Sequence, residues 1–203
     1  MKGLTVYILF IIINLNSFSQ YISNRNKLGI SGSIFVNEVF RFQEIEGAGW
    51  IDNGKGFRLG FDYSSRIRYN LWIHSGIHYL HASNDYYSAP INPSIPQISL
   101  KQNTNLFQFP ICLGYHFLFN EMLYFRTGLT IDYQFNKKED LFIDNQTGIG
   151  YSLEGGIKLD LENDLHINLG PEIQVLSIIP FNPGKHHQHF AIIGFNIVMG
   201  YEF

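Results

Sequence analysis

Charged residues are scarce in this chain of 203 residues, and long apolar runs are missing. Asp, Glu, Lys and Arg make up 15% of the residues, against about 25% in soluble proteins. A helical membrane protein needs several apolar runs of about 20 residues, and the sequence contains none. The net charge of −3 gives no basic surface of the kind that nucleic-acid binding requires, so we expect no nucleic-acid partner.

Cysteine is almost absent as well. Cys112 is the single cysteine, so no intramolecular disulfide can form, and we interpret it as a small buried residue rather than a nucleophile. No G-x-S-x-G motif occurs, and the adjacent His74 and Ser75 point to opposite faces of a predicted strand. The sequence therefore predicts no catalytic residues, no enzyme activity and no cofactor.

The first 19 residues have the pattern of a signal peptide. Lys2 precedes an apolar stretch from Leu4 to Leu15, and Ser17 and Ser19 stand at the small-residue positions of a cleavage site. The stretch is too short to span a bilayer comfortably as a membrane anchor. The sequence has no cysteine near the cleavage site, so we do not expect a lipoprotein. We predict Sec-type export, cleavage after Ser19, and one mature domain over residues 20–203.

Beyond residue 27, apolar residues recur at every second position, which is the period of a β-strand. Eight sets of alternate residues show this pattern, and no charged residue interrupts any of them. They span Leu28–Val36, Phe57–Tyr63, Leu71–Tyr79, Phe107–Phe117, Leu123–Phe135, Ile149–Leu159, Leu165–Val175 and Ala191–Phe203. Glycines and charges of both signs occupy the opposite face.

This distribution is inside out with respect to a soluble β-sandwich or a lipocalin-like barrel, which would scatter charges over its outer face. The predicted connections also alternate in length, as in outer-membrane barrels with short periplasmic turns. Long connections span 37–55, 82–105, 136–146 and 177–188, and short ones span 65–70, 118–121 and 160–164. The sequence predicts an all-β, eight-stranded antiparallel up-and-down transmembrane β-barrel, surrounded by outer-membrane lipid.

The inward face predicts a polar network in the lumen. Eight strands leave an interior just wide enough for side chains, and confined charges need partners. We expect the cations to pair with the anions and fill the lumen, as in OmpA-like small barrels; a narrow or gated pore is the alternative. The expected members are Arg58, Asp62, His74, Arg126, Asp132, Glu154, Lys158 and Glu172.

Eight histidines raise the question of a metal site. His186, His187 and His189 lie in or beside the last long connection, but no Cys or carboxylate stands close in sequence, so we expect a solvated loop and no metal. His74 and His78 lie about 13 Å apart along a strand and cannot chelate one ion unaided. Hydrogen bonds within the lumen are the expected use of these two residues.

Proline and the aromatic residues of the connections leave two further questions open. Pro110 and Pro171 lie within predicted strands, where each marks a bulge or a local break. Aromatic residues in the long connections can contact partners or pack the connections against each other, and the sequence favours neither.

Two segments resemble known outer-membrane proteins. The chain ends on alternate apolar residues, which resembles the signature read by the barrel-assembly machinery: Phe195, Ile197, Met199, Tyr201 and Phe203. Residues 106–115, Leu-Phe-Gln-Phe-Pro-Ile-Cys-Leu-Gly-Tyr, resemble a segment of a Bacteroidota outer-membrane barrel family that includes the PorT-like proteins. The Ser19-Gln20 pair at the end of the signal peptide also resembles the signal peptides of that group. The resemblance implies an outer-membrane barrel and, for PorT, a link to protein secretion, but no single activity.

We therefore expect a small outer-membrane protein that is structural, or that acts as a binding platform through its extracellular loops. Its expected partners are outer-membrane lipid and the barrel-assembly machinery. The first alternative is a subunit of a secretion or envelope-assembly complex, with envelope or secretion proteins as partners. The second alternative is a narrow gated pore.

Overall fold

The computed structural model describes residues 25–41, 50–87, 99–118, 121–135, 143–182 and 188–203. The described residues form nine strands: β1 (Asn26–Arg41), β2 (Trp50–Ile51), β3 (Gly54–Arg68), β4 (Leu71–Tyr87), β5 (Ser99–Phe117), β6 (Leu123–Gln134), β7 (Gly148–Asp160), β8 (Leu165–Pro180) and β9 (Gln188–Glu202). No helix among them is long and apolar enough to cross a membrane.

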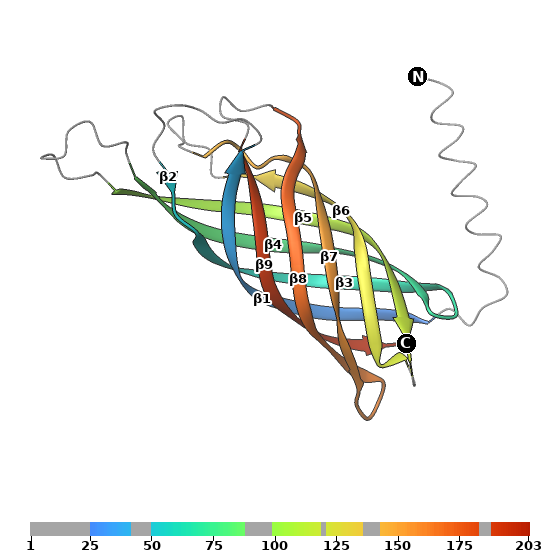
Figure 1. The fold of residues 1–203 in the computed structure, drawn as a ribbon. Helices are drawn as coiled ribbons and strands as arrows, with labels where there is room; N and C mark the ends of the chain where they lie inside the picture. Colours follow the sequence, from blue (N-terminus) through green and yellow to red (C-terminus); the bar gives the residue numbers. More distant parts are fainter. Residues whose placement is uncertain (1–24, 42–49, 88–98, 119–120, 136–142, 183–187) are drawn as a thin grey trace, which may run out of the picture.

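Eight long strands close into one barrel (Figure 1). Each pairs antiparallel with the next in the chain, and β9 pairs with β1 from Lys27↔Glu202 to Arg41↔Gln188. The two-residue β2 pairs antiparallel with the last two residues of β4, Tyr86 and Tyr87. The predicted eight-stranded antiparallel barrel is confirmed.

The apolar sets face outward, as predicted. None of their members is buried, and Ile30, Ile34 and Phe61 are 64%, 73% and 71% exposed. The alternate residues turn inward, and they include the charged side chains of Arg58, Asp62 and Glu172. Apolar side chains on the outside and charges within reverse the arrangement of a soluble barrel.

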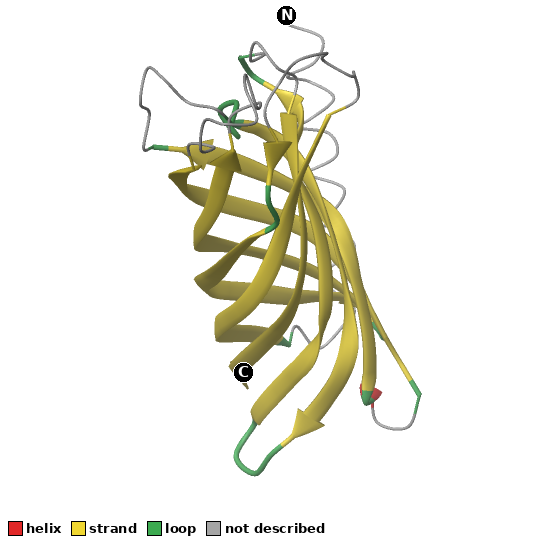
Figure 2. Cartoon of the chain, turned by 60° about the vertical axis from the view of Figure 1, so that its left-hand side comes forward, coloured by secondary structure: helices red, strands yellow, loops and turns green. Residues whose placement is uncertain are grey.

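The barrel has two different ends (Figures 1 and 2). At one, which we call the turn end, short connections join β3 to β4, β5 to β6 and β7 to β8, close to the C-terminus. The backbone at Tyr69, Asn163 and Asp164 has positive φ, which these tight reversals require. At the opposite end, which we call the loop end, β1, β4, β6 and β8 finish.

Towards the loop end, the strands run further than the apolar alternation predicts. β4 and β5 stay paired out to Tyr87↔Ser99, and this extension includes Asp85↔Lys101. Backbone hydrogen bonds continue there although the side chains are polar, because the ladder needs only N–H and C=O groups. The predicted connections were therefore too long at 37–55, 82–105 and 177–188, because β1 ends at residue 41, β4 at 87 and β8 at 180.

Both prolines produce local breaks without a change of register. Pairing between β4 and β5 stops at Ser75↔Ile111 and resumes at His78↔Gln108, which brackets Pro110. Pairing between β7 and β8 likewise omits Pro171. The bulge lies elsewhere, between the pairs Ile149↔Ile179 and Tyr151↔Val175. The prediction of a break at each proline is confirmed, and the predicted alternative of a bulge there is wrong.

Candidate functional site

The inward side chains form the candidate site, and its centre is an ion pair. Arg58 Nη2 on β3 lies 2.5 Å from Glu172 Oε2 on β8. Ser33 on β1 donates a hydrogen bond to the same carboxylate, and Gln174 Nε2 donates another at 3.2 Å. Both charged side chains are almost fully buried. Four side chains from three strands thus cross the middle of the lumen.

A second charged group lies around Arg126 on β6. Its guanidinium pairs with Glu154 on β7 and lies 3.6 Å from Asp62 on β3. Tyr124 donates its hydroxyl hydrogen to Glu154 at 2.7 Å, and His78 Nε2 lies 3.2 Å from Asp62. Because burial without partners is costly for each of these charges, the contacts favour one fixed arrangement.

Asp132 has a different set of partners from the expected cations. Gln108 Nε2 donates to its Oδ1 at 3.0 Å, and the backbone N–H of Ser177 donates to its Oδ2 at 3.2 Å. Ser177 lies in the β8 bulge with a φ of 51°, and His189 Nδ1 donates to its carbonyl at 2.9 Å. Asp132 therefore accepts hydrogen bonds, one of them from the bulge of β8, instead of pairing with one of the expected cations.

His74 contacts Ser64, a residue that the sequence analysis did not consider. The Ser64 Oγ lies 2.6 Å from His74 Nδ1 across the β3–β4 ladder, and the imidazole stacks on His116 with centroids 6.4 Å apart. A serine beside a histidine is the geometry of an activated nucleophile. Both residues are buried, so this pair has no open access for a substrate.

Lys158 lies apart from the other predicted members, at the turn end. Its Nζ lies 2.7 Å from Asp160, 3.9 Å from Glu202 and 4.0 Å from Glu121. Lys27 also approaches Glu202 at 3.4 Å, and its Nζ lies 3.8 Å from the Trp72 ring centroid. The charged side chains among them form a separate cluster at the turn end of the lumen.

Two small cavities lie between these groups. Each has a volume of about 10 Å³, and His74 and Arg126 line both. A cavity of about 10–15 Å³ holds one water molecule. The space that the described residues enclose here fits water and no larger ligand.

Near the loop end, a cluster of apolar residues lies among inward polar side chains such as Thr104 and Gln134. A cluster that we call the apolar stopper consists of Phe35, Leu80, Ala82, Leu106, Ile143, Leu176, Phe190 and Ile192. The sequence analysis missed it, because it treated the inward face as polar throughout. A usable signal was the unbroken apolar run Phe190-Ala191-Ile192-Ile193, which an outward face alone does not explain.

Residues 143–146 include Ile143, which belongs to the apolar stopper. We predicted them as part of a long connection, yet Ile143 and Gln146 are buried within the barrel. Gln146 donates its backbone N–H to Gln134 Oε1 at 2.8 Å and its side-chain amide to the Gln188 carbonyl at 3.0 Å. Such amide contacts satisfy the backbone of a non-strand segment away from water.

Further predicted features have separate outcomes. His186 and His187 lie outside the described residues, whereas His189 points inward and contacts Ser177. Among the described residues, no group of three His, Cys, Asp or Glu side chains is placed to hold a metal ion.

Cys112 is buried, as predicted. The five C-terminal alternate residues all face outward on β9 or just after it, and their part in assembly stays a prediction.

Comparisons with known proteins place the fold. The sequence matches no protein-family model, and no curated protein matches it significantly. The solid-state NMR structure of the outer membrane protein AlkL in DMPC bilayers matches 91% of this chain and 92% of its own, with a TM-score of 0.55 and 14% identity. OprG from Pseudomonas aeruginosa matches 89% of this chain and 95% of its own, with 0.51 and 11%. Neisserial surface protein A matches 87% of this chain and 97% of its own, with 0.50 and 12%. The chain therefore has the fold of small eight-stranded outer-membrane β-barrels.

Proposed function

We propose that this protein is a closed barrel of the outer membrane, and that it acts as a structural element or binding platform through its loop end. The outward apolar sets support the membrane setting, because a charged residue facing lipid at mid-depth costs about 2–4 kcal/mol and these sets carry none. The shared fold with AlkL, OprG and Neisserial surface protein A supports the outer membrane.

The filled lumen is the observation that carries the platform proposal. The ion pair of Arg58 with Glu172 crosses the middle, and the apolar stopper follows towards the loop end. A narrow pore needs a continuous water-filled path, and the buried ion pair and the apolar stopper argue against one. Binding at the loop end or on the outer surface needs no such path.

Conductance tests the closed lumen. We expect the purified protein in a planar lipid bilayer to give no steady ionic conductance, while a porin measured alongside does. Steady conductance that changes on substitution Arg126→Gln or Glu154→Gln would replace this proposal by the gated pore.

A second candidate is a subunit of a secretion or envelope-assembly complex. The resemblance of residues 106–115 to PorT-like proteins supports it. Native electrophoresis of mild-detergent extracts separates the two functions. A platform that works alone migrates near the mass of one chain, 23.4 kDa, plus bound detergent. Removal of the signal peptide would make the mass of that chain somewhat smaller. A much larger, reproducible assembly would favour the complex.

A further inference from the structure

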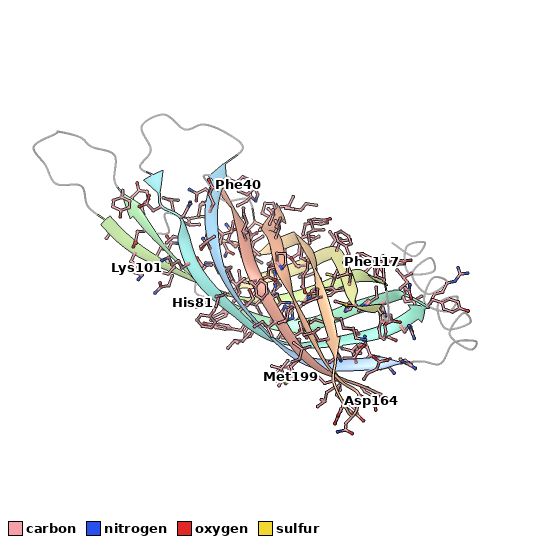
Figure 3. The ribbon with its side chains drawn as sticks, turned by 60° about the horizontal axis from the view of Figure 1, so that its bottom comes forward. Phe40, His81, Lys101, Phe117, Asp164 and Met199 are labelled. Carbon is pink, nitrogen blue, oxygen red and sulfur yellow. The ribbon has the colours of Figure 1, made fainter. Side chains whose placement is uncertain are left out.

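We propose that the loop-end mouth of the barrel is a peptide-binding seat, which the chain's own residues 143–146 occupy in this structure and which an extended segment of another protein takes in their place. The inference rests on the proposed binding platform and deepens it, because it names the class of partner and the contact that keeps it out. We call residues 143–146 the mouth segment. Figure 3 shows Phe40 and Lys101 at this end of the barrel and Asp164 at the other.

The mouth segment crosses the lumen from wall to wall. Gln102 on β5 accepts the backbone N–H of Ile143 at 3.3 Å, and Gln188 on β9 accepts that of Asp144 at 3.0 Å. In the closed eight-stranded order, β5 and β9 lie four strands apart, so they stand on opposite sides of the barrel. The segment is therefore bound to both walls of the mouth.

The wall recognises the backbone of the mouth segment. Gln134 on β6 accepts the N–H of Gln146 at 2.8 Å. With Gln102 and Gln188 it supplies three side-chain carbonyl acceptors, and almost every residue carries a backbone N–H to donate to them. One side chain adds specificity, because Ile143 is only 1% exposed and lies in the apolar stopper. Backbone contacts with one apolar anchor are the pattern of a site for an extended peptide.

The first residues of β9 form a short open edge on their β8 side. Within the described residues, the ladder between β8 and β9 stops at Val175↔Ala191. Gln146 closes the gap with its side chain, because its Oε1 accepts the Phe190 N–H at 3.3 Å and its Nε2 donates to the Gln188 carbonyl at 3.0 Å. These are the two groups that one residue of a neighbouring antiparallel strand would bind.

This edge determines the chemistry of the occupant. Asp144 Oδ2 also accepts the Gln188 N–H at 3.2 Å, so side chains of the mouth segment satisfy each of these backbone groups. An acyl chain offers neither donor nor acceptor to such an edge. An extended peptide offers both at every second residue, with the spacing of a strand. The Gln146 carboxamide thus takes the place of a partner's backbone.

The mouth segment is attached in a way that permits its release. It lies between strands, so side chains of the wall hold it where a backbone ladder holds the strands. Segments of this kind open locally at a lower free energy than the core strands. Because β7 begins at Gly148, the released segment stays tethered and competes with a partner at an effective concentration on the order of millimolar. Its seated form is therefore autoinhibitory.

The test is the binding of a fluorescent synthetic peptide to the full barrel in detergent micelles. The probe has the sequence of residues 143–147, Ile-Asp-Asn-Gln-Thr. Ile143→Asp removes the anchor of the mouth segment, and we expect this release variant to bind the probe at least about tenfold tighter than the unaltered barrel, whose own segment competes. Leu161→Asp, a matched substitution at an exposed position of the turn end, should bind as weakly as the unaltered barrel. If Ile143→Asp does not fold, Ile143→Ala should give a smaller gain in the same direction.

Two further measurements locate the bound peptide. In the release variant, Gln134→Leu removes one wall acceptor and should abolish the gain, and a probe with Asp in place of its Ile should show no gain. Hydrogen exchange should show the Phe190 amide losing protection in the release variant and regaining it when the probe is added. The Ile192 amide, on the part of β9 that pairs with β8, should stay protected throughout.

Four results would each overturn the inference. They are no gain in either release variant, an equal gain in Leu161→Asp, equal binding of the two probes, and a Phe190 amide that the probe does not protect. A gain that survives Gln134→Leu would do the same. Failure here leaves the platform proposal intact, because conductance and native electrophoresis test that proposal without a peptide.

Discussion

The carboxylate of Asp132 on β6 accepts the backbone N–H of Ser177, which lies in the bulge of β8 with a left-handed φ of 51°. The bulge removes this N–H from the ladder, and a buried backbone donor without an acceptor costs free energy. Asp132 thus satisfies a backbone group, while its other oxygen accepts from Gln108 at 3.0 Å. The Asp132 carboxylate therefore stabilises the bulged backbone of β8, which is a structural role within the lumen.

Removal of this carboxylate should destabilise the barrel. Asp132→Ala leaves the Ser177 N–H and the Gln108 amide without their acceptor, which we expect to lower the free energy of unfolding by about 1–3 kcal/mol. Urea unfolding of the refolded protein in lipid vesicles measures this. Asp164→Asn, in a solvent-exposed turn with positive φ, is the control and should change stability by less than about 0.5 kcal/mol. Equal effects of the two substitutions would contradict the assignment.

The buried ion pair predicts strong coupling between Arg58 and Glu172. Substitution of one partner alone, Arg58→Met or Glu172→Gln, leaves a buried charge without its counterion and should cost about 3–5 kcal/mol. The double variant should cost much less than the sum of the two, because no single charge is then stranded. The same unfolding assay gives all four values, and simple additivity would show that the two side chains do not interact.

Two glycines predict a steric limit where β7 meets β8. A Cβ built on Gly170 would lie 2.7 Å from the Gly156 Cα, and one built on Gly156 would lie 2.8 Å from the Gly170 Cα. Gly170→Ala should therefore reduce the yield of folded barrel, seen as loss of the faster-migrating form on unheated gels. Gly32→Ala, whose Cβ would be 3.6 Å from Leu59, should fold normally. Normal folding of both variants would refute the close approach.

The apolar stopper predicts a barrier that can be weakened. Phe190→Ala removes a fully buried ring, and we expect it to cost about 3–5 kcal/mol. Combined with Leu106→Ala, it should also give bilayer conductance that the unaltered protein lacks. Phe195→Ala, on the outward face of the same strand, removes an equal ring without opening the lumen. If both variants conduct alike, the stopper does not close the lumen.

The fold was predictable because the alternation of residues such as Ile193, Phe195 and Ile197 reports directly which face each side chain takes. Contacts within the lumen depend on register, which the sequence does not state. Ser64 meets His74 only because β3 and β4 pair with a particular offset, and Lys158 lies far from Arg58 along the barrel for the same reason. Likewise, Leu80 and Leu106 are inward apolar residues within largely polar faces, and only the closed barrel brings them together.

Orientation in the outer membrane is the central claim, and surface labelling of single cysteines tests it most directly. In a Cys112→Ser background, Lys101→Cys reports the loop end and Asp164→Cys the turn end, both at exposed positions. With a membrane-impermeant maleimide, we predict that Lys101→Cys is labelled on intact cells and that Asp164→Cys is labelled only after lysis. Labelling of Asp164→Cys alone on intact cells, or of neither variant until lysis, would contradict the account.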